Sequence, residues 1–245
     1  MLSKPHVSAY GRSDTGLKRS VNEDAYFIDA ASGCLVVADG VGGAAAGEVA
    51  SALFVDSVAT NLSGRKLATE DDAAVAIKEI FLEANAAIIT HATRHPDRAG
   101  MACTAEILIL LSQRFVLGHV GDSRTYRFRD GCLVRLTRDH SFVQQQLDLG
   151  RISEAEAKTH RYRNVIVRAV GSDESLDVDI IRGAAQSGDI FLLCSDGLTD
   201  MVAEHDIAAC LADGQELKDA VAYLVERANA AGGKDNITVV LASLP

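Results

Sequence analysis

Three apolar runs of the sequence each lead to an aspartate beside a glycine. The runs LLCSDG, CLVVADG and FVLGHVGD end at Asp196, Asp39 and Asp122. A glycine next to a carboxylate permits the tight turn and the close backbone approach that metal coordination needs. Hard divalent cations such as Mg²⁺ and Mn²⁺ prefer oxygen ligands, and Mg²⁺ keeps several waters, so a few carboxylates suffice. Together with Asp235, these residues predict a divalent-metal site at the ends of strands.

A single aspartate in such a place is more often a turn or cap residue than a metal ligand. Four of them at comparable positions favour the metal-site interpretation. Several carboxylates that converge in one cleft repel one another and would take up protons unless cations neutralise them. We therefore expect metal binding to stabilise this region.

The aspartates need a rigid scaffold, and the apolar pattern predicts strands that provide one. Asp130-Gly131 separates two of these strands as a two-residue hairpin turn. Successive hairpin-like strands from 105 to 136 favour antiparallel pairing. The predicted strands are Ala25–Ala30, Leu35–Ala38, Ala105–Leu111, Phe115–Val120, Thr125–Arg129, Leu133–Leu136, Leu176–Arg182, Ile190–Cys194 and Ile237–Ala242.

Three segments repeat apolar residues at helical spacing. One spans 47–62, a second follows Thr69 as N-cap with Asp72 three residues on, and a third spans 217–228. Each helix needs a sheet to cover its apolar face, so two packed sheets flanked by helices would fit an α+β chain.

The segment from 139 to 171 is polar, helix-prone at Val143–Leu149, and inserted between predicted strands. We interpret it as a flap. Its part from 151 to 168 has a local charge of +3, which would attract a phosphorylated or acidic segment, although a solvated basic surface explains it equally well. The charged residues there are Arg151, Lys158, Arg161, Arg163 and Arg168 against Glu154 and Glu156.

Composition restricts the class of protein. The chain has 245 residues, 48% of them hydrophobic, and no Pro-rich or Ser-rich linker, which predicts one domain over 1–245. A net charge of −10 opposes general affinity for nucleic acid or an anionic membrane. No apolar run is long enough to span a bilayer, and the first residues have no signal-peptide core, so we expect a cytoplasmic protein. The five cysteines form no CxxC pair, which argues against a disulfide framework or a zinc knuckle.

Five motifs follow one another along the sequence: RSVNEDA at 19–25, VVADGVGGAAAGEVAS at 36–51, GDSR at 121–124, CSDGLTD at 194–200 and KDNITVV at 234–240. In order and spacing they resemble those of the metal-dependent type-2C (PPM family) serine/threonine protein phosphatases in their bacterial single-domain form. The resemblance covers nearly the whole chain. It implies a four-layer αββα sandwich and hydrolysis of phosphoserine and phosphothreonine in proteins, with a cognate Ser/Thr kinase as partner and a monomeric state.

The resemblance also implies which residues bind two core ions, Mn²⁺ or Mg²⁺. Asp39 matches the carboxylate that bridges both metals, with the backbone carbonyl of Gly40 on one of them. Asp196 and Asp235 match the ligands of the other. Asp122 matches the residue that binds a weaker third ion together with the Asp196 position.

Three residues near the N-terminus complete the implied site. Glu23 and Asp24 match an acidic pair that reaches the metals mainly through waters, and Arg19 matches the arginine that grips the substrate phosphate. A water that bridges two dications becomes a hydroxide nucleophile near neutral pH, so no phosphoenzyme is required. The planar fork of Arg19 suits two phosphate oxygens and would fix the in-line approach.

Two alternatives remain open. The chain could be a pseudophosphatase that binds phosphoproteins without hydrolysing them, although the intact acidic set argues against this. An aspartyl-phosphate hydrolase would need a DxDx[TV] motif, which is not evident. No side-chain general acid is visible, because Val41 and Ala44 stand where relatives often have histidine. His119 could serve, but a strand histidine is more often structural.

Overall fold

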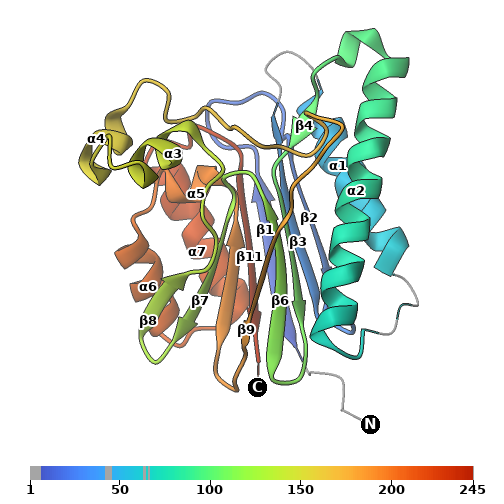
Figure 1. The fold of residues 1–245 in the computed structure, drawn as a ribbon. Helices are drawn as coiled ribbons and strands as arrows, with labels where there is room; N and C mark the ends of the chain where they lie inside the picture. Colours follow the sequence, from blue (N-terminus) through green and yellow to red (C-terminus); the bar gives the residue numbers. More distant parts are fainter. Residues whose placement is uncertain (1–6, 42–45, 63–64, 66, 245) are drawn as a thin grey trace.

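Two antiparallel sheets lie face to face, with helices outside each of them (Figure 1). The computed structural model describes residues 7–41, 46–62, 65 and 67–244. The first sheet has the order β1 (Ser8–Asp14), β11 (Ile237–Ser243), β10 (Ile190–Cys194), β7 (Arg124–Arg129) and β8 (Cys132–Arg135). The second has the order β2 (Asp24–Asp29), β3 (Cys34–Val41), β5 (Ala105–Leu110), β6 (Arg114–Val120) and β9 (Asp179–Ala184), and the short β4 (Ala102–Cys103) pairs with β3.

Both faces of the central strands are buried. In β3, Val37 points into the core between the sheets with Leu193 and Val240, whereas Val36 packs outward against the helices with Phe54. Because neither face meets water, these strands read as continuous apolar runs rather than alternating ones. That is why they were the easiest elements to predict.

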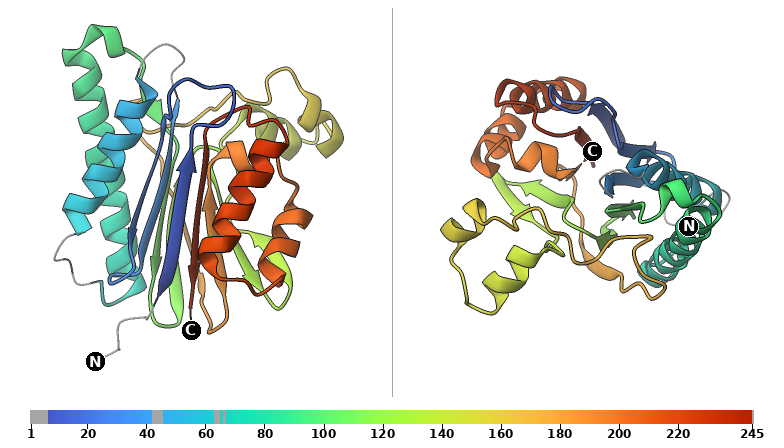
Figure 2. Two further views of the ribbon diagram at one scale, coloured as in Figure 1. Left: turned by 180° about the vertical axis from the view of Figure 1, so that it is seen from behind. Right: turned by 90° about the horizontal axis from the view of Figure 1, so that it is seen from above.

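Helices cover the outer face of each sheet, as the two further views in Figure 2 show. On the second sheet lie α1 (Gly47–Leu62) and α2 (Glu70–Arg94). Thr69 and Asp72 form the predicted capping box at the start of α2. The first sheet is covered by α5 (Asp196–Thr199), α6 (Glu204–Ala212) and α7 (Leu217–Ala230), while the 3₁₀ helix η1 (Pro96–Arg98) follows α2. The prediction of a four-layer αββα sandwich is confirmed.

All nine predicted strands are present, with ends within three residues of those expected. Asp130 and Gly131 have φ of +50° and +78°, which confirms the predicted hairpin turn between β7 and β8. The described chain adds β1, β4, η1, α5, α6 and a helix at Glu154–Thr159, which the sequence pattern did not predict. None of the helices in the described ranges combines the length and the apolar character needed to cross a lipid bilayer.

The segment 139–171 lies between β8 and β9 and extends beside the end of the sandwich (Figure 1). It contains α3 (Phe142–Asp148) and α4 (Glu154–Thr159), each with a serine N-cap. Its two ends pair with each other: the Phe142 amide donates to the Val165 carbonyl at 2.8 Å, and the Val167 amide donates to the His140 carbonyl at 2.8 Å. The inserted segment is therefore closed at its base.

Candidate metal centre

The strand ends bring the predicted aspartates to one end of the sandwich. Asp24 at the start of β2 lies opposite Asp39 of β3 in the antiparallel register. Asp122 follows β6, and the Thr104 amide next to β5 donates to the Asp39 carbonyl at 2.8 Å, so these strand ends adjoin. Asp196 follows β10 in the opposite sheet, where it begins α5. Residues far apart in the sequence therefore meet between the two sheets.

Asp24 connects the two sheets directly. Its Oδ2 accepts hydrogen bonds from the Ser195 hydroxyl at 2.8 Å and from the Thr238 hydroxyl at 2.7 Å. Its Oδ1 is buried and has no hydrogen-bond partner among the described residues. Burial raises the pKa of Asp24 to about 6, although the two hydroxyl donors act in the opposite direction. An orphan carboxylate oxygen of this kind is suited to a cation or to a water bound to one.

The other carboxylates are close enough to perturb one another. Burial, then the charges of Asp24 and Asp196, raises the pKa of Asp39 well above its usual value. Burial, then the charge of Asp122, does the same for Asp196. The pKa of Asp122 is raised to about 7, by burial first and by the charge of Asp139 second. These shifts are the electrostatic signature of acidic groups gathered in a poorly solvated place.

Asp235 lies at the more exposed side of the site, beside Arg19. Arg19 Nη2 is 2.7 Å from Asp235 Oδ2, and Arg19 Nη1 is 3.7 Å from Glu23 Oε2. Asn236, to which the sequence analysis gave no role, holds this loop: its Oδ1 accepts from the Glu23 amide at 2.8 Å, and its Nδ2 donates to the Val21 carbonyl at 3.0 Å. The KDNITVV motif contains Asn236 next to Asp235, which is the signal that could have found it.

The glycines after Asp39 and Asp196 allow backbone contacts that a side chain would block. A Cβ on Gly40 would lie 2.3 Å from the Gly47 carbonyl oxygen, and one on Gly197 would lie 1.9 Å from the Asn236 carbonyl oxygen. The close approach that the sequence predicted at these positions is therefore present. These close backbone contacts fix the main chain beside Asp39 and Asp196, and so the positions of the two carboxylates.

The residues fit divalent cations by chemistry rather than by a finished ligand geometry. Within the described ranges, no three His, Cys, Asp or Glu side chains already surround a common ligating point. However, the side-chain donors are all carboxylates, Asp122 is buried and the others are only partly exposed, and Asp24 Oδ1 has no hydrogen-bond partner among the described residues. Hard divalent ions would neutralise the repulsion that raises the pKa values of Asp39 and Asp196.

Two other interpretations from the sequence can be judged. His119 is fully buried, with one ring nitrogen on Glu106 and the other 2.8 Å from the Arg138 carbonyl, so it is a structural residue and not a general acid. Cys103 is buried, and burial raises its thiol pKa, as expected for core filling. Ala44 lies outside the described residues.

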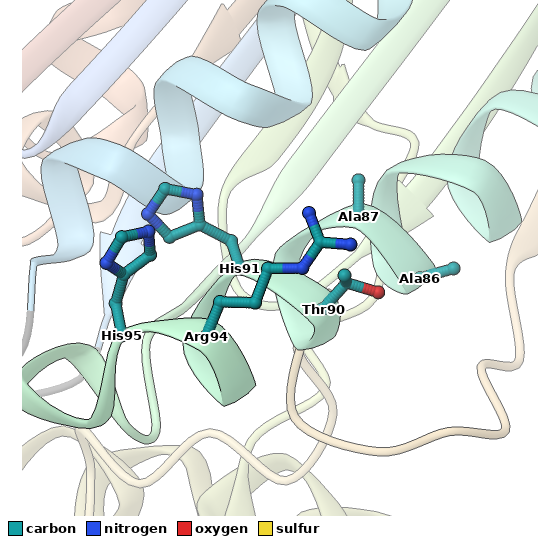
Figure 3. A pocket seen from close by; sticks show the side chains of 6 residues that line it. All are labelled: Ala86, Ala87, Thr90, His91, Arg94 and His95. Atoms are coloured by element: carbon teal, nitrogen blue, oxygen red, sulfur yellow. The ribbon is translucent and has the colours of Figure 1, made fainter.

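A cavity of about 390 Å³ lies elsewhere, on the last turns of α2 (Figure 3). The rings of His91 and His95 are 4.5 Å apart there, and Arg98 Nη1 is 2.7 Å from His91 Nε2. Arginines beside the imidazoles oppose a cation, and none of the predicted site residues lines this cavity. The metal interpretation therefore belongs to the carboxylates. The cavity is lined by Ala86, Ala87, Thr90, His91, Arg94 and His95.

Fold and site together define an αββα protein with a carboxylate-rich centre between its two sheets. A family model described as protein phosphatase 2C matches residues 17–242. The serine/threonine phosphatase stp of Listeria monocytogenes is 35% identical over 234 residues, which cover 94% of this chain and 93% of that protein. The chain belongs to the protein phosphatase 2C family.

Two further relatives bear on the site. The serine/threonine protein phosphatase PstP of Mycobacterium tuberculosis is 40% identical over 236 residues, which cover 95% of this chain but only 44% of PstP. The chain thus spans less than half the length of that relative. A crystal structure of the catalytic domain of PstP in complex with two manganese ions matches with a TM-score of 0.88 and 35% identity, over 97% of this chain and 98% of that one.

Proposed function

We propose that this chain is a metal-dependent protein phosphatase that hydrolyses phosphoserine and phosphothreonine. The observation that carries the proposal is the meeting of Asp24, Asp39 and Asp196 from two sheets in a buried, mutually repelling group. Two manganese ions in the PstP catalytic domain support Mn²⁺ as the cofactor. We also propose that Mg²⁺ can replace it, as hard oxygen-ligated cations of equal charge do.

Each carboxylate has a proposed role. Asp39 would be the ligand shared by two ions, and the carbonyl of Gly40 would hold one of them. Asp196 and Asp235 would hold the other, and Asp196 with Asp122 would hold a weaker third. Glu23 and Asp24 act through waters; the hydroxyl donors on Asp24 Oδ2 leave Oδ1 to make such a contact.

When bound, the ions would lower the pKa of an attacking water and offset charge on the phosphoryl oxygens. The chain itself binds and orients the substrate. Arg19 is poised at the exposed side of the site, and its guanidinium can exchange Asp235 for two phosphate oxygens. Asp39 and Asp196, which are only partly exposed, fix the charge of the centre, and the phosphate is held in line by Arg19.

The biological setting is also a proposal. The substrates are phosphorylated proteins, and a cognate Ser/Thr kinase would produce them. We propose a cytoplasmic, monomeric enzyme in which this chain forms one phosphatase domain with 139–171 as its flap, and which has no affinity for nucleic acid or membrane, in keeping with the net charge of −10.

The test is hydrolysis of a phosphothreonine peptide and an aryl phosphate by the purified chain. EDTA should abolish both activities, and Mn²⁺ should restore them. Undiminished turnover in metal-free protein would overturn the mechanism. Tight phosphopeptide binding without turnover at saturating Mn²⁺ would instead support the pseudophosphatase alternative.

A further inference from the structure

A buried polar group lies directly behind the turn that presents Asp122. Glu106 and His119 face each other across β5 and β6, and both side chains are 0% exposed. His119 Nδ1 contacts Glu106 Oε1, and the Thr125 hydroxyl donates to Glu106 Oε2 at 2.7 Å. The other nitrogen of His119 is 2.8 Å from the Arg138 carbonyl. Both ring nitrogens therefore face acceptors.

This arrangement favours the imidazolium form of His119. Burial opposes the charge, but the Glu106 carboxylate outweighs it and raises the pKa of His119 above its usual value. Burial also raises the pKa of Glu106, so Glu106 and His119 form one coupled, hydrogen-bonded pair inside the second sheet. A pair this well hydrogen-bonded is a rigid support for anything packed against it.

His140 packs on that support. Its ring centroid is 4.5 Å from that of His119, with an interplanar angle of 36°. The Gly121 amide donates to His140 Nδ1 at 3.0 Å, and the His140 amide donates to the Gly121 carbonyl at 2.7 Å. One residue thus holds both polar groups of Gly121, which precedes Asp122 and has φ of +113°.

The second nitrogen of His140 faces the end of the inserted segment. Because Nδ1 accepts from Gly121, the ring proton is on Nε2, which lies 3.3 Å from Asp179 Oδ2. Arg168 Nη1 donates to Asp179 Oδ1 at 2.8 Å and lies beside the same ring nitrogen without donating to it, because that nitrogen carries the proton. Burial, then the charges of His119 and Arg168, lowers the pKa of His140 to about 4. The ring is neutral near pH 7, as an acceptor for Gly121 must be.

His140 also joins the two ends of the segment 139–171. Its carbonyl accepts from the Val167 amide at 2.8 Å, directly before Arg168. His140 stands at the start of the segment, and its side chain and backbone together bond to the Gly121 turn and to Val167 at the segment's end.

We propose that His140 is a positioning residue that locks the Gly121–Asp122 turn to the base of the inserted segment. Through this lock, Asp122 is presented to the weaker third ion and to the leaving group of the substrate. The inference rests on the proposed phosphatase function and on the proposed role of Asp122. An apolar residue of similar size would fill the space but could not accept from Gly121.

The test compares His140→Leu with His140→Asn, whose side-chain oxygen can replace Nδ1 as acceptor. On a phosphothreonine peptide at saturating Mn²⁺, the leucine variant should lose roughly tenfold or more in kcat, and the asparagine variant should recover most of it. An aryl phosphate, with a good leaving group, should show a loss of about threefold or less in the leucine variant. His91→Leu, in the cavity of Figure 3, is the matched control and should change neither rate.

A double-mutant cycle identifies the route of the effect. In an Asp122→Ala background, His140→Leu should cause no further loss on the phosphopeptide, because the residue acts through Asp122. Independent, additive losses would overturn the inference, as would equal losses for Leu and Asn. Failure of the phosphatase proposal looks different, because the parent would then hydrolyse neither substrate with Mn²⁺.

Amide hydrogen exchange gives a readout that needs no activity. The Gly121 amide should be protected in the parent and in His140→Asn, and exchange at least tenfold faster in His140→Leu, while amides in the centre of β6 stay protected. Unchanged protection of Gly121 in the leucine variant would show that His140 does not hold the turn.

Discussion

Replacement of Arg19 by alanine should separate phosphate binding from metal binding. Arg19 Nη2 is 2.7 Å from Asp235 Oδ2, but the arginine side chain is 48% exposed and the aspartate 33%. An ion pair that exposed contributes at most about 1 kcal/mol to folding. Arg19→Ala should therefore lower the free energy of unfolding by about 1 kcal/mol or less.

The kinetic effect should be much larger. A charged donor directed at a transition-state oxygen contributes about 2–4 kcal/mol, which corresponds to a loss of roughly 30- to 900-fold in kcat/KM. The affinity of Arg19→Ala for divalent metal should rise, although its kcat/KM falls. Since the guanidinium no longer competes for Asp235, Mn²⁺ should bind up to about fivefold more tightly, the equivalent of the ~1 kcal/mol pair. Arg19→Lys should be intermediate in kcat/KM because it keeps the charge and loses the planar fork.

The assay combines steady-state kinetics on a phosphopeptide with Mn²⁺ titration calorimetry. Arg114→Ala is a matched control. Arg114 is 49% exposed and pairs with Glu70 at 3.0 Å, and it begins β6, whereas Asp122 follows the other end of that strand. It should lose no activity. The reasoning is refuted if Arg19→Ala stays within threefold of the parent in kcat/KM, or if its Mn²⁺ affinity falls tenfold.

Three other substitutions test the charge and the packing of the site and of the fold. Asp39→Asn should lose both tight Mn²⁺ ions by calorimetry and all turnover, yet its metal-free form should unfold at no lower temperature in EDTA, because a buried and repelled carboxylate is gone. Gly197→Ala should weaken Mn²⁺ binding more than tenfold, a shift calorimetry would detect, since its Cβ would lie 1.9 Å from the Asn236 carbonyl oxygen and displace that loop. Burial opposes the charge of Asp189, but hydrogen bonds from Arg129 at 2.5 and 2.6 Å outweigh it and lower the pKa below 3.8. The stabilisation is present above the unfolded pKa and lost as pH falls through the folded one, so Asp189→Asn should cost about 1–3 kcal/mol in urea unfolding at pH 7, and this difference should shrink progressively as the pH falls below 3.8.

The fold was predictable where a buried strand or helix requires a regular pattern of apolar residues. Strands such as β3 and β10 are apolar on both faces, and the helices α1, α2 and α7 have one apolar side each. β1 has no such signal because its residues SAYGRSD are polar and only partly buried at the edge of a sheet. Gly11 contributes no side chain to the pattern. A Cβ at this position would lie 2.8 Å from the Tyr26 ring, so the residue has to be small. Edge strands depend on a partner that the local sequence does not specify.

The site was predictable in its carboxylates but not in what holds them. Asp24 receives its two hydroxyl donors from residues 171 and 214 positions away, Ser195 and Thr238. Asn236 reaches the Glu23 amide over 213 positions. In the sequence, Ser195, Thr238 and Asn236 look no different from the many serines, threonines and asparagines that face solvent in proteins. Their role follows only from the packing of one sheet against the other.

His119 shows where the sequence did give the right answer. It could have served as a general acid, but a strand histidine is more often structural, and both of its nitrogens are occupied inside the sheet. Burial first, and then the charges of His119 and Arg168, keep the neighbouring His140 neutral and so able to accept from Gly121. A residue that cannot reach the substrate thus contributes to the protonation state of one that holds the site. The contacts from Glu106 to His119, from His119 to His140 and from His140 to Gly121 thus connect the core of the second sheet to the turn before Asp122.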